Sequence, residues 1–540
     1  MFVLQQPAGK RARLSKWYLL GDDKHYTPCD VPLLTKESID ATLPANATAL
    51  DYLKLYVTDE IIDLVVKQTN TYADQYIASH PIKPHSSVQN WVKTDREEIF
   101  TFLGLCILMG IAYKPRIPMY WSTDAIFHSD IFSTVMSRDR FLLLLRFLHF
   151  ADNTTVNASD PNRDKLWKLR QFTELVRERC KKVYTPGRDL CVDESLLLFK
   201  GRLGFKQYIK SKRARFGIKF FQLCTRSGIF LDFLIYSGDM SKELKMDGDF
   251  LISERIPITL IQPYLNKGHR LFLDNFYTST RLAEFLLEQN TTMVGTVRPN
   301  RRNFPADLVA TSVDRGESKF ALSENGILAV KFRAKQDKAN KKPKIVYLLS
   351  TAHKDEIAAS SKPDKDGNPV LKPTCVLEYN KSMGGVDLMD QQLDSLLVIR
   401  KSYKWYKKVF FRVIMQCMLS AHKLMQLNGG QQDFLKFLHD AVTQLLTFAP
   451  RLHRHTSAPD SIARLTGRNH FPSKRKYEGT GTDRAAKSKK CRVCSARGRR
   501  TPKGAAVETT WVCEVCPSVP GLCLETGCFR DYHTKFDYSQ

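Results

Sequence analysis

Residues 189–201 have the sequence DLCVDESLLLFKG, a short apolar run that carries an aspartate near its middle. Three similar segments follow it: IKFFQLCT (218–225), IFLDFLIYSG (229–238) and HRLFLDNFYTS (269–279). Each is bounded by glycine or by charged residues and is short for a helix, so each is predicted to form a β-strand. Residues 281–290 then show helical periodicity, and residues 292–298 return to a strand pattern. Strands in succession, followed by alternating helix and strand, predict a mixed α/β sheet.

Helical patterns flank this predicted sheet on both sides. Apolar residues recur at three- and four-residue steps between residues 44 and 188, for example in SRDRFLLLLRFLHF (137–150). The hydroxyl of Ser137 can cap the first turn of that helix. Residues 401–427 and 433–446 have the same amphipathic spacing after the sheet.

Two regions lack a regular period. Residues 298–373 are basic and rich in predicted loops, and a core-like pattern resumes after them, which indicates an insertion in the sheet domain. Residues 1–43 are polar and carry a basic cluster at Lys10, Arg11 and Arg13, so they are expected to form a disordered arm.

The chain is strongly basic, with a net charge of +27 and a pI near 9.5. Such a charge predicts a polyanionic partner, and DNA, RNA and anionic membrane all qualify. The most apolar stretch, residues 99–113, is shorter than the roughly 20 residues that cross a bilayer and is predicted to be a buried helix. The N-terminus lacks the basic-then-apolar order of a secretory signal, so no membrane partner is expected.

Three aspartates stand where a metal site could be built. Asp193 lies inside the first predicted strand, Asp274 ends the fourth, and Asp387 begins a helical stretch in SMGGVDLMDQQ (382–392). An aspartate inside an apolar strand is costly unless it is paired or metal-bound. Carboxylates on rigid elements suit Mg²⁺, and two such ions about 3.5–4 Å apart serve phosphoryl transfer. The alternative is that these residues are turn or cap residues, with Gly384 and Gly385 forming a plain tight turn.

Four segments together resemble the piggyBac transposase family: VDESLLLFKGR (192–202), LDNFYTS (273–279), VGTVRPNRR (294–302) and YNKSMGGVDLMDQ (379–391). Their order and spacing match over nearly the whole chain. The resemblance implies a ribonuclease-H-like catalytic core (189–297 and 374–396), interrupted by an insertion domain (298–373). It also implies that the flanking helices (44–188 and 397–457) fold together into an all-α dimerisation and DNA-binding domain.

The resemblance assigns Asp193, Asp274 and Asp387 as the catalytic residues that hold two Mg²⁺ ions, with Mn²⁺ able to substitute. Asp390 matches a further family aspartate, which either touches metal or orients the helix. The implied activity is that of a cut-and-paste DNA transposase, which acts as a homodimer on transposon terminal inverted repeats and on TTAA target DNA. All the principal carboxylates are present, which favours an active enzyme.

A stretch of 20 residues after Asp193 is a candidate DNA contact. Residues 200–219 contain eight lysines and arginines, no acid, and interleaved aromatic rings, a pattern that can neutralise phosphates and stack on bases. The alternative is a solvated charged face. Another basic stretch lies at residues 331–344. The candidate DNA contacts are Lys206, Lys210, Lys212, Arg213 and Arg215 in the first stretch, and Arg298, Arg301 and Arg302 after the fifth strand.

The end of the chain carries a zinc signature. Two Cys-x2-Cys pairs are separated by eighteen residues, and further ligands follow at four-residue gaps. The seven candidate ligands are Cys491, Cys494, Cys513, Cys516, Cys523, Cys528 and His533. One zinc uses four ligands, so a cross-braced pair of ions needs an eighth, either Asp531 or another group. Residues 491–540 are expected to form this zinc module after a basic linker (458–490), and family members use such a tail to recognise transposon ends.

Two alternative functions stay open. A domesticated, transposase-derived DNA- or chromatin-binding protein would keep the fold without transposition. A RING-type ligase is suggested by the cross-brace-like cysteines, but it leaves nearly 490 residues unexplained. Basic clusters at residues 474–476 and 487–492 are typical of a nuclear import signal, so the nucleus is the expected location.

Overall fold

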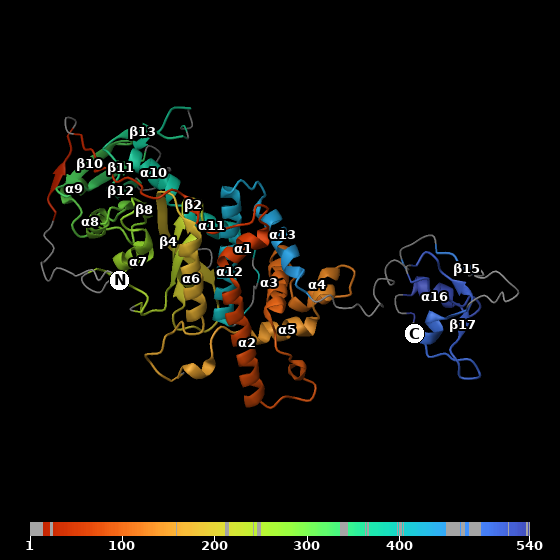
Figure 1. Cartoon of the computed structure of the whole chain (residues 1–540). Helices are drawn as coiled ribbons and strands as arrows, with labels where there is room; N and C mark the ends of the chain where they lie inside the picture. Colours follow the sequence, from red (N-terminus) through yellow and green to blue (C-terminus); the bar gives the residue numbers. More distant parts are fainter. Residues whose placement is uncertain are drawn as a thin grey trace. The chain divides into compact units, whose positions relative to one another are not determined.

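The computed structural model describes residues 15–538 except for several short segments. The exceptions are 22–24, 158, 211–214, 241, 246–249, 335–343, 362, 364–366, 397, 399–401, 403, 450–464, 466–469, 475–487, 517 and 536–537. The chain divides into two compact units, Met1–Ala449 and Pro450–Gln540 (Figure 1).

The first unit is built on one ten-stranded mixed sheet. Its order is β1-β10-β11-β12-β9-β8-β4-β6-β5, and β7 also pairs with β6. In the centre of the sheet, β8 is parallel to both β9 and β4. All other strand pairs are antiparallel. The strands are β1 (Trp17–Leu19), β4 (Asp189–Leu198), β5 (Gln207–Tyr208), β6 (Phe216–Thr225), β7 (Phe230–Ile235), β8 (Arg270–Leu273), β9 (Thr292–Thr296), β10 (Ser318–Ser323), β11 (Leu328–Arg333) and β12 (Ile345–Ser350).

The strands predicted from apolar segments are confirmed as β4, β6, β7, β8 and β9, and the predicted helix between the last two is α8 (Thr280–Glu288). Other helices around the sheet are α7 (Ile252–Ile261), α9 (Ala306–Ala310), α10 (Thr374–Ser382) and α11 (Gly385–Asp394). Small antiparallel pairs are formed by β2 (Ser38–Ile39) with β3 (Tyr184–Thr185), and by β13 (Ile357–Ala359) with β14 (Leu371–Pro373).

Residues 298–373, expected to be basic and loop-rich, contain more regular structure than the sequence indicated. Strands β10, β11 and β12 lie in this segment and extend the main sheet beyond β9. Lys331, which made the segment look like a basic surface, is buried in the middle of β11. Its ammonium group donates to the carbonyl oxygens of Val309 (2.7 Å) and Thr311 (2.6 Å), so its charge is used inside the fold.

The disorder expected for residues 1–43 is wrong for the part that the structure describes. Strand β1 pairs with β10, and the indole of Trp17 donates to the carbonyl of Asn303 (3.0 Å). Pro32, farther along the arm, lies directly against Gly268, which has a φ of +81°. A Cβ added to Gly268 would lie only 1.9 Å from the carbonyl oxygen of Pro32. The arm is therefore ordered by tertiary contacts along the sheet, as the red segment beside the green strands in Figure 1 shows.

The helical part surrounds one long buried helix, α12 (Trp405–Leu427), which packs against α1, α11 and α13. The predicted buried helix near residues 99–113 is confirmed as α3, and Ser137 caps α5 through the backbone N–H of Arg140 (3.3 Å). No described helix is both long and apolar enough to cross a membrane. The helices are α1 (Ala49–Tyr56), α2 (Asp59–Ser79), α3 (Arg96–Ile111), α4 (Asp130–Val135), α5 (Arg138–Phe147), α6 (Arg170–Val183), α12 and α13 (Phe434–Leu446).

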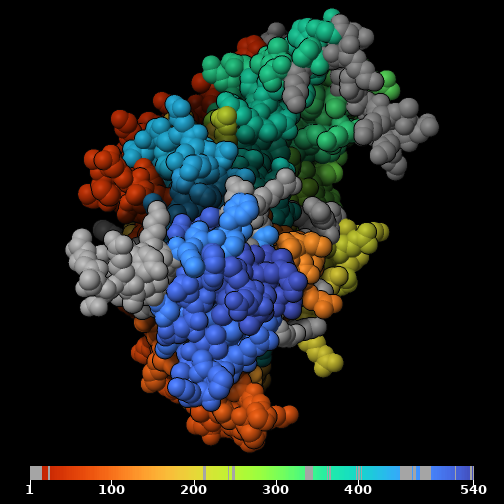
Figure 2. Space-filling model, turned by 90° about the vertical axis from the view of Figure 1, so that its right-hand side faces the viewer, coloured from red at the N-terminus to blue at the C-terminus, as the bar shows by residue number. Residues whose placement is uncertain are grey.

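The second unit is small and has a core made mostly of cysteines. Its strands pair as β15 (Ser473–Lys474) with β18 (Trp511–Val512) and as β16 (Lys489–Lys490) with β17 (Glu508–Thr509). Two short helices, α15 (Arg492–Ala496) and α16 (Cys528–Thr534), pack on each other. The described residues of this unit are drawn in blue in the space-filling view of Figure 2.

A buried ion pair joins α6 to the sheet. Asp232 on β7 is fully buried, and its carboxylate accepts from Arg177 (2.5 Å) and Lys181 (3.1 Å) on α6. Removing one partner of such a pair leaves the other charges buried without compensation.

We therefore predict that Asp232→Ala lowers the free energy of unfolding by about 3–5 kcal/mol. Asp139→Ala is the control, because its pair with Arg138 is exposed and is worth less than about 1 kcal/mol. Urea denaturation followed by tryptophan fluorescence measures both, and equal losses in the two variants would contradict the prediction.

Candidate functional site

Asp193 and Asp274 lie side by side on neighbouring parallel strands. The register of β4 and β8 pairs Val192 with Leu273, and each aspartate is the next residue along its strand direction. The two carboxylates therefore leave the sheet at the same edge, where ligands bind in open α/β sheets.

Asp274 lies in a partly desolvated environment. Burial raises the pKa of its carboxyl above the ordinary value, and the negative charge of Glu194 acts in the same direction. The backbone N–H of Phe276 donates to the carboxylate (2.9 Å) and opposes this shift. A cation placed beside Asp274 would favour the ionised form of its carboxyl, as expected for a metal ligand.

Asp387 lies in the first turn of α11, a helix that packs on the strand of Asp193. Helix α11 packs against β4 and β6, and Gly385, its first residue, touches both strands. A Cβ added at Gly385 would lie 2.2 Å from the carbonyl oxygen of Thr225 and 2.8 Å from the sulfur of Cys191. Cys191 is two residues from Asp193 on β4, so this contact holds the helix next to the first aspartate.

The two glycines differ in role. An added Cβ at Gly384 would meet nothing within 4 Å, and neither glycine has a positive φ. Gly384 lies in the short turn between α10 and α11, as the tight-turn interpretation expected, but that interpretation does not account for Gly385. Gly385 is required by the close approach of a helix to a sheet.

The three carboxylates do not form a closed cluster. Within the described ranges, two groups of candidate ligands have all their atoms within 4.8 Å of one another: one of four cysteines and one of two cysteines and two histidines, and neither includes these aspartates. Two metal ions about 3.5–4 Å apart need a wider arrangement of ligands than one ion does. The donor set of three carboxylates fits hard divalent cations.

Asp390 is held by protein contacts. Its Oδ1 accepts from the hydroxyl of Ser195 on β4 (2.9 Å) and forms an ion pair with Arg412 on α12. These contacts tie α11 to the sheet and to the central helix, which supports the helix-orienting role for Asp390.

Tyr379, Glu194 and Lys219 also lie at this edge, and no sequence pattern had singled them out. Burial, together with the charges of Asp274 and Asp193, raises the pKa of Tyr379 to about 12. Glu194 forms an ion pair with Lys219 of β6 (2.6 Å). Their proximity depends on the pairing of β4 with β6 and on the packing of α10, which local sequence does not reveal.

The predicted DNA contacts divide into four groups. Lys210, Arg215, Arg298 and Arg302 are exposed, whereas Lys206 is half-buried and donates to the carbonyl of Gly201 (3.2 Å). Lys212 and Arg213 lie outside the described residues. The remaining residue, Arg301, makes hydrogen bonds within the protein.

Arg301 is used inside the protein. Its guanidinium donates to the carbonyl oxygens of Phe276 (2.8 Å) and Thr278 (2.9 Å) in the loop after Asp274, and burial lowers its pKa. It braces the loop that presents the second carboxylate, and this role accounts for its position after β9.

The second unit contains two tetrads of candidate zinc ligands. One consists of Cys491, Cys494, Cys523 and Cys528, and the other of His470, Cys513, Cys516 and His533. The two tetrads alternate along the chain, which is a cross-braced arrangement. All seven predicted ligands are included, and thiolate and imidazole donors in fours suit structural Zn²⁺.

His470 supplies the eighth position, and the suggestion of Asp531 is wrong. The carboxylate of Asp531 instead accepts from Arg497 (2.8 Å). The Nδ1–H of His533 donates to the carbonyl of Phe529 (2.8 Å), which leaves Nε2 for the metal. Because His470 and β15 belong to the module, the expected boundary at residue 491 lies too late.

Comparison with known proteins agrees with this arrangement. The family model described as Transposase IS4 matches residues 48–422, and the model described as DDE_Tnp_1-like zinc finger matches residues 477–534. PiggyBac transposable element-derived protein 3 of Homo sapiens is 27% identical over 503 residues, which cover 90% of this chain and 76% of that protein. PiggyBac transposable element-derived protein 2 of Homo sapiens is 25% identical over 401 residues, covering 71% and 63%.

A solved structure is also similar over almost its full length. The cryo-EM structure of a piggyBac transposase synaptic complex with hairpin DNA has a TM-score of 0.68 and 26% sequence identity. The match covers 91% of this chain and 98% of that chain.

The contact at Gly385 predicts a difference between neighbouring glycines. Gly385→Ala should push α11 off the sheet, lower the free energy of unfolding by about 1–3 kcal/mol, and weaken Mn²⁺ binding. Gly384→Ala, in open space, should leave both unchanged. Urea denaturation and an electron paramagnetic resonance titration with Mn²⁺ measure the two effects, and equal behaviour of the variants would refute the assignment.

The zinc tetrads predict the metal content of two variants. His470→Ala should reduce the bound zinc from two ions to one per chain, whereas Asp531→Asn should keep both. Mass spectrometry of the metal content after extensive dialysis gives the ratio. Loss of zinc in Asp531→Asn alone would restore the aspartate as the ligand.

Proposed function

Because the chain belongs to the piggyBac-type transposases, within the family described as Transposase IS4, we propose that it excises and integrates a DNA element by metal-dependent phosphoryl transfer. The observation that supports the proposal is that Asp193 and Asp274 follow paired residues of adjacent parallel strands, while α11, whose first turn carries Asp387, packs on the strand of Asp193.

The three carboxylates would hold two Mg²⁺ ions, with Mn²⁺ able to replace them. When bound, these ions supply Lewis acids that activate the attacking oxygen and stabilise the leaving oxygen. The protein contributes position. Arg301 fixes the loop of Asp274, Gly385 lets α11 reach the sheet, and Asp390 with Arg412 fixes the orientation of that helix.

DNA is the proposed substrate and partner. The net charge of +27 favours a polyanion, and the exposed cations Lys210 and Arg215 lie in the connection between the paired strands β5 and β6. The zinc module would recognise transposon terminal inverted repeats, and integration would occur at TTAA sites. Two subunits would hold two DNA ends, so we propose a homodimer that acts in the nucleus.

A second candidate function has its own support. The human relatives are named as transposable element-derived proteins, so a domesticated DNA-binding protein without transposition is the alternative. The three retained aspartates favour the enzyme.

We predict that Asp193→Asn, Asp274→Asn and Asp387→Asn each lower the rate of DNA strand cleavage by about 100-fold or more, because each removes a charge that the metal requires. Each variant should keep its affinity for DNA. Asp139→Asn, on an exposed helix end, is the control.

Excision of a donor element and gel-shift binding measure the two properties. A variant that cleaves at near the wild-type rate would remove that residue from the site. Absence of cleavage by the wild-type chain with Mg²⁺ or Mn²⁺, together with intact DNA binding, would support the domesticated alternative.

A further inference from the structure

A separate pocket of about 310 Å³ lies in the first unit, away from the three aspartates. Three cations line it, together with three aromatic rings: Arg163, Lys165 and Lys168, and Trp167, Phe205 and Trp405. They come from the segment before α6, the loop after β4 and the start of α12. The volume is at the lower end of the range for small-ligand sites, about 300–1,000 Å³.

The positive charge in this pocket is not balanced by nearby acids. Lys168 is half-buried, and its ammonium lies 5.0 Å from the ring centroid of Trp167 and 4.9 Å from that of Tyr406. Among the described residues, no carboxylate forms an ion pair with Lys165 or Lys168. Burial and the charge of Lys404 lower the pKa of Lys168. A partly desolvated cation gains most from an anionic ligand.

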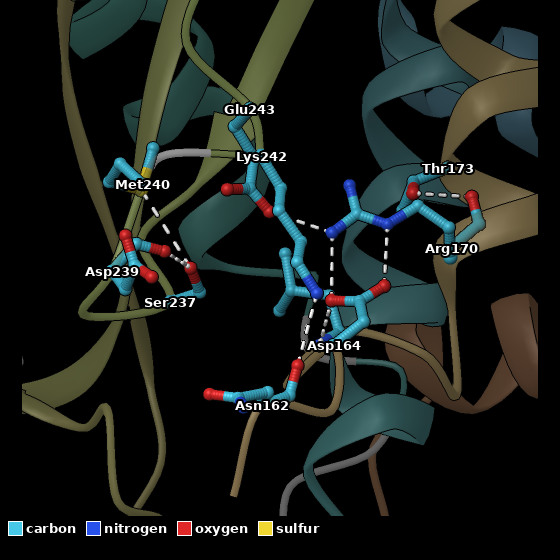
Figure 3. A network of polar contacts seen from close by, with 10 residues as sticks. Asn162, Asp164, Arg170, Thr173, Ser237, Asp239, Met240, Lys242 and Glu243 are labelled. Atoms are coloured by element: carbon cyan, nitrogen blue, oxygen red, sulfur yellow. Dashed lines mark hydrogen bonds and ion pairs between the residues drawn. The ribbon is translucent and has the colours of Figure 1, made fainter. Parts of the chain in front are cut away.

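The two carboxylates next to the pocket, those of Asp164 and Glu243, are bound to Arg170. Asp164 lies between the lining cations in sequence, but its carboxylate accepts two hydrogen bonds from Arg170 (2.7 and 2.8 Å). Glu243 accepts a third from the same guanidinium (2.7 Å), and Lys242 donates to the carbonyl of Asn162 (3.1 Å). Figure 3 shows this network, which fixes the wall and neutralises its acids.

The pocket is connected to the catalytic edge by two rigid elements. Lys408 of α12 donates to the carbonyl of Leu198, the last residue of β4 (2.9 Å). From Asp193 to Leu198 is about 17 Å along a strand. From Trp405 to Arg412, which pairs with Asp390, is about 10 Å along a helix. Both elements therefore run from the neighbourhood of the pocket to residues near Asp193 and Asp390.

We propose that this pocket binds one unpaired nucleotide of the DNA substrate, next to the part of the DNA that the carboxylates would hold. The base stacks on the indole rings of Trp167 and Trp405, and Lys165 and Lys168 hold the adjacent phosphate. Aromatic rings beside cations are the usual means of binding single-stranded DNA. A paired base cannot enter such a pocket, because its faces are covered in the duplex. The inference rests on the proposed function.

The test uses the Asp193→Asn chain without divalent metal, so that DNA is bound and not cut. DNA ends carry 2-aminopurine at one position at a time, and the fluorescence of each is measured on binding. We expect one unpaired position to respond most. Trp405→Ala should abolish that response and weaken binding of this DNA by about 5- to 100-fold, with a smaller effect on fully paired DNA.

Four further variants separate recognition from folding. Trp405→Phe keeps an aromatic ring and should retain most of the response. Lys168→Met should weaken binding and Lys168→Arg should restore it, while Lys436→Met on the exposed face of α13 should change nothing. Thermal melting confirms that each variant is folded.

The outcomes distinguish the pocket from the enzyme. If the wild-type chain cuts DNA but no position responds, or if the response survives in Trp405→Ala, the pocket proposal is overturned and the proposed function stands. If free deoxyadenosine monophosphate fills the pocket as tightly as DNA does, the pocket is a small-molecule site and the proposal is also overturned. If the wild-type chain does not cut DNA while one position still responds through Trp405, only the proposed catalysis fails.

Discussion

The contact of Gly385 with strands β4 and β6 seats helix α11, whose first turn carries Asp387, on the main sheet. Two aspartates come from adjacent parallel strands and are aligned by hydrogen bonds of the sheet itself. The third comes from a helix, which must approach the sheet so closely that no Cβ fits between it and the carbonyl of Thr225. Once α11 is seated, Asp390 connects it to Arg412 and Ser195, so that the central helix and the first catalytic strand share one hydrogen-bonded group.

Several buried or half-buried cations of this chain form hydrogen bonds and ion pairs inside the protein. Lys331, Lys407 and Lys408 are buried and donate to backbone carbonyls. Burial, with the charges of Lys404 and Lys168, lowers the pKa of Lys407 to about 7. Arg177 and Lys181 neutralise Asp232. The cations left for a polyanion are therefore fewer than the net charge indicates, and those of the pocket before α6 stand out because their neighbouring acids are bound to Arg170.

The second unit depends on a different constraint. Its core has few apolar side chains and consists largely of sulfur atoms. Because the two tetrads alternate along the chain, each ion would tie together segments that also hold the other ion, and binding free energy of such ions supplies folding free energy. Recruitment of His470 extends this cross-link to a residue before the first cysteine pair, so the module includes a segment whose basic composition resembles a linker.

The sequence by itself determined the elements with a local period. Strands β4 and β6 to β9, helices α3, α5 and α12, and the two Cys-x2-Cys pairs follow from residues that are close along the chain. Only the tertiary structure decided that β1 and β10 to β12 join the main sheet, that His470 completes a tetrad, and that Arg301 faces inward. These features arise between residues far apart in sequence, where burial and pairing are set by the partner. A lysine in an exposed strand and a lysine in a buried strand can have the same local sequence pattern. Only the packing of the strand decides whether the lysine is exposed or buried.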